Sequence, residues 1–206
     1  MLGRRRTRAV DHEDVLRVAT EILSTTGPLA VTRERVASAL GVPEQQLDVD
    51  VDAVLAEAYR TLSTTESAQV KRTILANPSP VEQMRALLAV LATPPEDDSD
   101  AFRLEAWVLA RRNPALRSAV QDSAAAWHAL VASVIRRGAR TGEFHETDAD
   151  EVATHVVSLI EGINSYQLIG YQADVDRMRL LTRVLQAELG MTWGPDLTVA
   201  LDANPT

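Results

Sequence analysis

Arginines near the N-terminus and at the start of a predicted helix are the side chains best suited to bind a polyanion. Guanidinium groups neutralise phosphates and donate planar pairs of hydrogen bonds to them. An arginine arm can lie along a minor groove, and adjacent glutamines can read an adenine edge. The candidate nucleic-acid contacts are Arg4, Arg5, Arg6, Arg8, Thr32, Arg33, Arg35, Pro43, Glu44, Gln45 and Gln46.

Acidic residues in the same part of the chain oppose this chemistry. Residues 1–60 contain eight bases and ten acids, a net charge of −2, and residues 44–52 carry four acids and no base. Asp48, Asp50 and Asp52 repel DNA if they point outward. The alternative is that they cap the next helix and favour its positive N-terminal dipole. For the arginine arm the alternative is a solvated tail.

A second set of residues could line a cavity for a small molecule. Pockets of this kind combine large apolar side chains with a few polar groups that orient the ligand. The candidate ligand-binding residues are Met84, Phe102, Trp107, Trp127, His128, Asn164 and Tyr166. The alternative for Trp107 and Trp127 is that they only fill the core.

Residues that could support catalysis or metal binding do not form a known pattern. His145, Glu146, Asp148 and Asp150 match no closed metal site, and their position is better explained as the start of a helix. There is no cysteine, and no phosphate-binding loop or nucleophile elbow is found. The sequence therefore predicts no enzyme activity, no cofactor and no metal.

Helices must position all of these residues, because apolar residues recur at helical spacing and nowhere alternate as in a strand. We expect an all-α protein of about nine helices. Their approximate ranges are 11–26, 33–40, 43–47, 50–75, 80–91, 101–112, 114–141, 147–170 and 173–189.

Local signals set the ends of these helices. Thr32 is a good N-cap, Gly41 ends the second helix, and Pro43 favours the first turn of the third. A capping box begins at Ser79, and Asn113 supplies the cap of the helix at 114–141, whose first turn begins with a proline.

Composition fits a globular helical protein. The 206 residues are 46% hydrophobic and 24% charged, with a net charge of −8, which excludes a dedicated polyanion coat. Neither a secretory signal nor an apolar stretch long enough to span a membrane is expected. We expect a cytoplasmic location and no membrane partner.

The first three predicted helices are spaced as in a helix-turn-helix module, and the whole arrangement resembles the TetR (tetracycline-repressor-like) family of transcriptional regulators. Thr32 matches the family's capping position, and Ala37 and Gly41 match its small-residue turn. The matching segments are LRVATEILSTTG (16–27), VTRERVASALGV (31–42), AWVLARRNPALR (106–117), RTGEF (140–144) and LIEGI (159–163).

One departure from the family pattern concerns the residues that grip DNA phosphates. The family usually places a tyrosine, an aromatic residue and a lysine after the position of Leu47. Here Asp48 follows, no aromatic residue appears before Tyr59, and no lysine before Lys71. Operator recognition is therefore the part of the resemblance that this sequence puts in doubt.

Two apolar stripes near the C-terminus predict a homodimer. Paired helices from each subunit would form a four-helix bundle around a twofold axis. The candidate interface residues are Val152, Val156, Leu159, Ile160, Ile163, Met178, Leu181, Val184 and Leu185. Burial of the same stripes within one subunit is the alternative.

The resemblance implies a ligand-responsive, DNA-binding homodimer, most simply a repressor, and the candidate cavity residues favour an apolar or amphipathic small-molecule effector. The alternative is a helical ligand-binding or protein-interaction dimer that has lost specific DNA binding. The predicted divisions are a helix-turn-helix domain at 1–50, a ligand-binding and dimerisation domain at 51–192, and a tail at 193–206.

Overall fold

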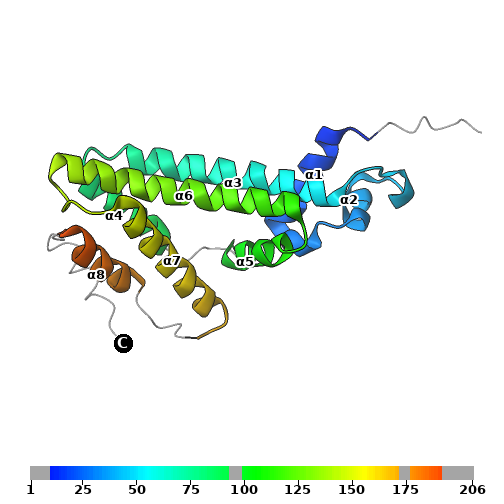
Figure 1. The fold of residues 1–206 in the computed structure, drawn as a ribbon. Coiled ribbons are helices and arrows are strands. Elements are labelled where there is room, and N and C mark those ends of the chain that lie inside the picture. The colour runs from blue at the N-terminus through cyan, green and yellow to red at the C-terminus, as the bar shows by residue number, and fades with distance from the viewer. Residues whose placement is uncertain (1–9, 93–98, 172–176, 192–206) are drawn as a thin grey trace, which may run out of the picture. The chain divides into compact units, whose positions relative to one another are not determined.

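The computed structural model describes residues 10–92, 99–171 and 177–191, in which every regular element is a helix (Figure 1). The eight α-helices of these residues confirm the all-α prediction. They are α1 (His12–Thr26), α2 (Arg33–Leu40), α3 (Val51–Leu75), α4 (Pro80–Ala92), α5 (Ser99–Ala110), α6 (Pro114–Thr141), α7 (Ala149–Leu168) and α8 (Arg177–Leu189). Two short 3-10 helices, η1 (Pro28–Ala30) and η2 (Glu44–Gln46), lie on either side of α2.

The signals that bound α2 act as predicted. The Thr32 hydroxyl accepts a hydrogen bond from the backbone N–H of Arg35 at 3.2 Å, which satisfies one otherwise unpaired donor of the first turn. At the other end Gly41 adopts a left-handed conformation with φ +68°, which a residue with a Cβ adopts only with strain.

The expected third helix differs from the prediction in kind. It is present only as the three-residue 3-10 helix η2, and Pro43 lies before it in extended conformation (ψ 140°) instead of in its first turn. An α-helix this short gains too few hydrogen bonds to repay its nucleation cost. Leu47 then turns inward and is 2% exposed, and the chain reaches α3 through residues 48–50 without a regular element.

The chain forms two compact units. Unit 1 comprises residues 1–64 and 101–122, and unit 2 comprises residues 65–100 and 123–206. The predicted domain bounds at residues 50 and 192 stay predictions, and the predicted tail at 193–206 lies outside the described residues.

The core of unit 1 joins α1 and α2 to the N-terminal parts of α3 and α6 and to α5. Its large buried side chains include Leu23, Leu47, Leu55, Tyr59 and Leu116. Burying one leucine side chain contributes about 1.5–3 kcal/mol, so Leu47 anchors the segment between η2 and α3 although that segment has little regular structure.

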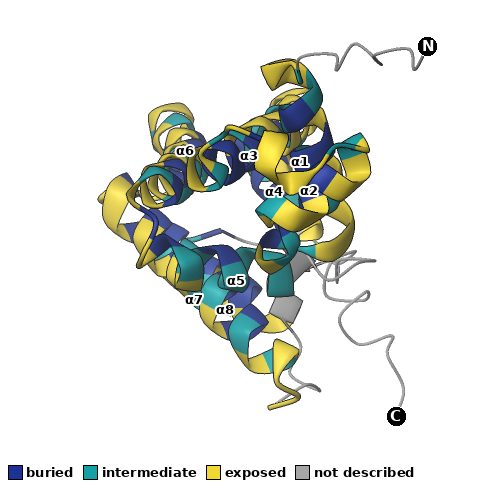
Figure 2. Ribbon diagram, turned by 90° about the vertical axis from the view of Figure 1, so that its right-hand side faces the viewer, coloured by how far each residue is buried: buried dark blue, intermediate teal, exposed yellow. Residues whose placement is uncertain are grey.

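The core of unit 2 is larger and formed mainly by aliphatic side chains. It packs Ile74, Leu87, Ile135, Val156 and Leu185 from five helices, each at most 1% exposed. Buried and exposed residues occupy different faces of the helices (Figure 2). No helix among the described residues is both long and apolar enough to cross a lipid bilayer.

Candidate nucleic-acid interface and ligand sites

The predicted DNA contacts that the structure describes lie mainly on the surface of unit 1. Thr32, Arg35, Pro43, Glu44, Gln45 and Gln46 are exposed, and Arg33 is half-buried. Arg4, Arg5, Arg6 and Arg8 lie outside the described residues. The roles of all these residues at DNA stay predictions.

Arg33 makes two intramolecular hydrogen bonds that the sequence did not predict. Its guanidinium donates to the backbone carbonyls of Leu47 and Val49, the latter at 2.7 Å. Two N–H groups of one planar fork thus hold the segment between η2 and α3. Arg35, two residues along α2, has an exposed side chain that lies free to approach a phosphate.

Of the three aspartates that follow η2, one caps α3, and all three remain exposed. One carboxylate oxygen of Asp50 accepts hydrogen bonds from the backbone N–H groups of Asp52 (3.0 Å) and Ala53 (3.3 Å). The capping alternative therefore holds for Asp50. Asp48, Asp50 and Asp52 are all exposed, so their negative charge remains at the surface of this module.

Asn113 connects the corner between α5 and α6 with the first turn of α3. This side chain is 5% exposed, and its Oδ1 accepts a hydrogen bond from the N–H of Leu116 at 2.9 Å, which confirms the predicted cap of α6. Its Nδ2 donates to the carbonyl oxygen of Asp52 at 3.0 Å. A second, longer bond runs from Arg60 Nη2 to the Ala115 carbonyl at 3.4 Å. The corner thus contacts the helix that follows the acidic segment.

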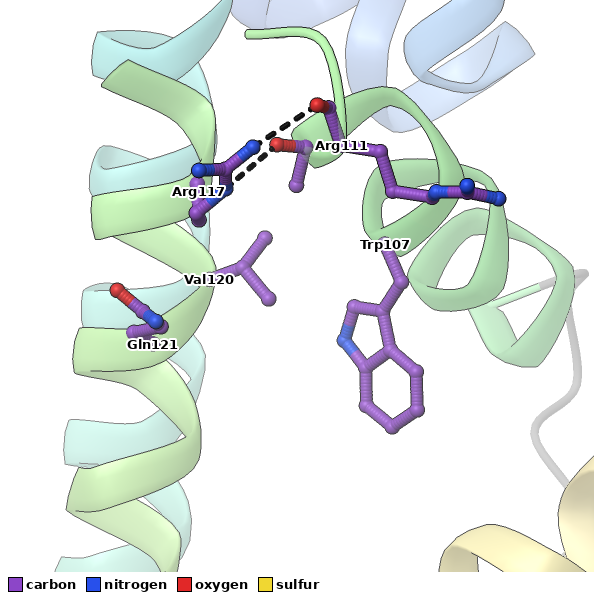
Figure 3. Close-up of a pocket in the computed structure, with 6 residues that line it drawn as sticks. Trp107, Arg111, Arg117, Val120 and Gln121 are labelled. Atoms are coloured by element: carbon purple, nitrogen blue, oxygen red, sulfur yellow. Dashed lines mark hydrogen bonds between the residues drawn. The ribbon is translucent and has the colours of Figure 1, made fainter. Parts of the chain in front are cut away.

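The predicted ligand-binding residues of unit 1 have different surroundings. Phe102 stacks on Tyr59 with ring centroids 5.7 Å apart and planes 6° from parallel. Trp107 is half-buried and lines a hollow of about 480 Å³ together with Ala110, Arg111, Arg117, Val120 and Gln121. Figure 3 shows the indole ring on the α5 side of this hollow, with Val120 and Gln121 on the α6 side.

The predicted ligand-binding residues of unit 2 range from core to surface. Met84 is fully buried, Asn164 is 8% exposed, and Trp127 packs half-buried against the core. The Nε2 of His128 lies 3.0 Å from both the Asp150 carbonyl and the Thr154 hydroxyl, which ties it to α7. Tyr166 is exposed and contacts the edge of Tyr171.

Gln83 is a polar core residue that the sequence analysis missed. It is fully buried, and its Nε2 donates to the Asn77 carbonyl at 2.8 Å. Its Oε1 is buried without a hydrogen-bond partner among the described residues. Leaving such an acceptor unsatisfied costs about 1–3 kcal/mol. The only feature of the sequence that could have indicated its burial is its place next to Met84, near the start of an amphipathic helix.

The predicted interface stripes lie mostly inside unit 2. Of the predicted residues, Val152, Val156, Ile160, Ile163, Leu181 and Leu185 are buried within the chain, and Leu159 and Val184 are half-buried. The side chain of Met178 lies outside the described residues. Burial within one subunit was the alternative for these stripes, and an interface stays a prediction. Exposed apolar side chains instead include Tyr166, Leu168, Ile169, Tyr171 and Leu180.

The acidic residues near the start of α7 serve that helix and its neighbours. Asp148 caps α7 by accepting from the N–H groups of Asp150 (3.0 Å) and Glu151 (3.2 Å). Asp150 pairs with Arg136 at 2.9 Å. Within the described parts of the chain, no group of three or more possible metal ligands gathers.

Comparison with known proteins places the chain in a family. Residues 80–190, more than half of the chain, match the family model of the C-terminal domain of BetI-type transcriptional repressors, a TetR C-terminal family. No curated protein sequence matches the chain.

Several solved structures share the fold. A transcriptional regulator from Saccharomonospora viridis, solved in complex with choline, is 22% identical with a TM-score of 0.72, and the match covers 86% of this chain and 96% of that one. A TetR-family regulator from Cytophaga hutchinsonii is 16% identical (TM-score 0.69; 88% and 96% covered). The multidrug-binding protein EbrR, complexed with proflavin, is 20% identical (TM-score 0.57; 84% and 98% covered).

Proposed function

Because the chain belongs to the TetR family of transcriptional regulators, with a C-terminal domain of the BetI type, we propose that it is a homodimeric, ligand-responsive repressor. The family and the solved structures of this fold are transcriptional regulators and not enzymes. The operator, the effector and the dimer are the parts that we infer.

The hydrogen bond from Asn113 to the Asp52 carbonyl is the observation that carries the proposal. It joins the α5–α6 corner to the turn of α3 that directly follows the candidate DNA-facing segment. A ligand switches a regulator only if it binds one arrangement of the DNA-facing elements better than another. A short polar link between the two sets of elements gives such a preference a physical route.

The cations that are predicted to contact DNA support binding of a particular kind. Arg35 and the N-terminal arginines would contact phosphates, and Gln45 and Gln46 would reach base edges. Exposed Asp48 and Asp52 oppose the approach of a polyanion. We therefore expect a modest affinity, which falls steeply with salt because contacts between cations and phosphates supply most of the binding free energy.

The effector would be an apolar or amphipathic small molecule. In unit 2 the unpaired Oε1 of Gln83 next to Met84 supplies a polar group inside an apolar core, and ligand pockets are commonly built this way. Solved relatives of this fold bind choline and proflavin, which supports a small organic effector.

Exposed apolar residues at the end of α7 support the homodimer. Ile169 is 75% exposed and Tyr166 is 52% exposed, which is costly for a monomer in water. Two DNA-binding modules must also reach half-sites about 34–36 Å apart, and a dimer provides them.

A gel-shift series with the chain's own upstream DNA, between 50 and 200 mM salt (roughly the range over which phosphate contacts weaken most), tests operator binding. We expect a specific complex at low salt that weakens steeply. Absence of any specific complex at low salt would contradict the repressor.

Sedimentation velocity tests the dimer separately. Ile169→Asp places a charge on the exposed end of α7 and is expected to yield monomers, whereas Val108→Asp, at a position of α5 that is 66% exposed, is expected to leave dimers intact. A wild-type monomer at micromolar concentration would contradict this part.

A second function is favoured by a specific observation. Arg33 donates to backbone carbonyls and the exposed surface beside it is acidic, so the module is poorer in available cations than its sequence indicates. A ligand-binding or protein-interaction dimer without specific DNA binding fits this surface. The same gel-shift series distinguishes the two functions.

A further inference from the structure

The hollow at the α5–α6 corner combines the indole ring of Trp107 with the guanidinium group of Arg117, and Arg111 also lines it (Figure 3). We propose that it binds a small organic anion, a carboxylate carried on an aromatic or alkyl body. This inference deepens the proposed effector response by naming a site and a chemical class, and its ligand-binding part can be tested without DNA.

The apolar side of the hollow suits the body of such a ligand. Trp107, Ala110 and Val120 contribute apolar surface, and the indole ring of Trp107 stands opposite Val120 (Figure 3). Its volume is about 480 Å³ and it opens widely to solvent, so a bound ligand would keep one face exposed. A flat aromatic ligand could stack on the indole, a geometry worth about 0.5–1.5 kcal/mol beyond burial alone.

Arg117 is the cation that defines the polar side. Its Nε donates to the Ala110 carbonyl at 3.1 Å, and its Nη2 donates to the Arg111 carbonyl at 2.8 Å (Figure 3). A guanidinium carries five N–H groups, so three remain after these two bonds. The two bonds hold the group in place before a ligand arrives, which lowers the entropy cost of binding.

The remaining polar lining favours an anion over a cation. Arg111 is exposed, and its guanidinium extends away from Arg117, so it adds a positive charge near the hollow and not within it (Figure 3). Gln121 adds a neutral amide, and the described lining residues include no acid. A positively charged ligand would meet the charge of Arg117 with no carboxylate of the lining to offset it. A carboxylate gains charge-assisted hydrogen bonds from the same guanidinium group.

The position of the hollow explains how occupancy would reach the DNA-facing segment. Asn113 lies in the chain between Arg111 and Arg117, which both line the hollow, and its side chain bonds to the Asp52 carbonyl. A ligand that shifts the end of α5 against the start of α6 therefore acts directly on this bond.

Isothermal titration of the full-length protein with 2-naphthoate tests the site. We expect a dissociation constant below about 1 mM, with 2-naphthylmethanol at least about fivefold weaker and 2-naphthylmethylammonium weaker still, because only the anion pairs with the guanidinium group of Arg117. Equal affinity for the three probes, or no heat from 2-naphthoate at millimolar concentration, would overturn the inference.

Three exposed positions locate the binding. Gln121→Glu adds an acid to the lining and Arg111→Gln removes a cation, so each is expected to weaken 2-naphthoate binding by about threefold or more. Arg112→Gln removes the same charge one residue away, at a position that does not line the hollow, and is expected to change affinity by less than about twofold. Equal effects of Arg111→Gln and Arg112→Gln would show that the anion binds elsewhere.

The two proposals fail in different ways. If 2-naphthoate binds as expected and no DNA complex forms, the site stands and the repressor does not. If the DNA complex forms and 2-naphthoate does not bind, the repressor stands and this site is wrong.

Discussion

The segment between η2 and α3 and the core of unit 2 are held by different forces. Leu47 is the segment's one deeply buried side chain, and hydrogen bonds from Arg33 to the carbonyls of Leu47 and Val49 hold the segment, while Asn113 bonds to the carbonyl of Asp52 in the first turn of α3. The core of unit 2 instead packs large aliphatic side chains from five helices. One region depends on a few directional polar bonds, the other on close packing.

This difference bears on how a regulator could be switched. A hydrogen bond contributes about 0.5–1.5 kcal/mol net and can be exchanged for another as its partners move. A packed core resists small displacements, because its contacts are lost together when side chains separate. We infer that the segment adjusts while the core of unit 2 keeps its shape.

The largest effect is expected from a cavity in the core of unit 2. Leu87→Ala removes a fully buried side chain of α4 and is expected to lower the free energy of unfolding by about 2–5 kcal/mol. Urea unfolding followed by circular dichroism measures this change.

Val90→Ala, on the exposed side of the same helix, is the matched control and is expected to cost less than about 0.5 kcal/mol. Similar losses for the two variants would mean that α4 does not pack as described, and the contrast between the two regions would then lose its basis.

A smaller effect is expected where the α5–α6 corner meets α3. Asn113→Ala removes the oxygen that accepts from the N–H of Leu116 and caps α6, and it removes the donor to the Asp52 carbonyl. Because two backbone groups lose a partner, the free energy of unfolding is expected to fall by about 2 kcal/mol. Thermal unfolding measures the loss.

Asn113→Asp separates the two roles of this side chain. The carboxylate keeps the capping oxygen but cannot donate to the Asp52 carbonyl, so we expect the cap of α6 to be kept while any ligand response of DNA binding is lost. Part of the stability stays lost, because the second carboxylate oxygen faces that carbonyl in a nearly buried site. A full ligand response in Asn113→Asp would contradict the proposed route.

The elements that the sequence predicts well are those with local causes. The bounds of α2 follow from Thr32 and Gly41, and the start of α6 follows from Asn113, because caps act within one turn of the chain. The all-α fold follows from apolar periodicity, which every long helix expresses.

Features with distant causes were beyond prediction. The bonds of Arg33 join residues 14 and 16 positions apart, and a sequence pattern records a cation without its partner. The helical spacing of apolar residues such as Val156 and Leu185 correctly predicted an apolar face. Periodicity does not reveal, however, whether the same subunit or a second one covers that face.

Two arginines of α2 allow a sharper comparison at about the 1 kcal/mol level. Arg33→Gln loses both carbonyl contacts and is expected to lower stability by about 1 kcal/mol, whereas Arg35→Gln, at an exposed position, is expected to change it little. Thermal unfolding and hydrogen exchange at residues 47–50 report the difference.

DNA binding is expected to rank these variants differently. Arg35→Gln should reduce the slope of the logarithm of the binding constant against the logarithm of the salt concentration by an amount that corresponds to about one phosphate contact. Arg33→Gln should weaken binding but leave this slope unchanged. If Arg33→Gln lowered the slope and left exchange at residues 47–50 unaltered, Arg33 would contact phosphate and the segment would be held by other means.

The smallest effect is expected from a surface ion pair of unit 2. Asp150→Asn breaks the 2.9 Å pair with Arg136, and because both side chains are about half exposed or more, the loss should stay below about 1 kcal/mol. Glu151→Gln, the next residue of the same helix turn, removes an equal charge near the same dipole and serves as the control.

Urea unfolding at low and high salt isolates the contribution of the ion pair, since screening should remove the difference between the two variants. A loss above about 2 kcal/mol that persists at high salt would exceed what an exposed pair supplies, and would mean that unit 2, like the segment of unit 1, depends on specific polar bonds.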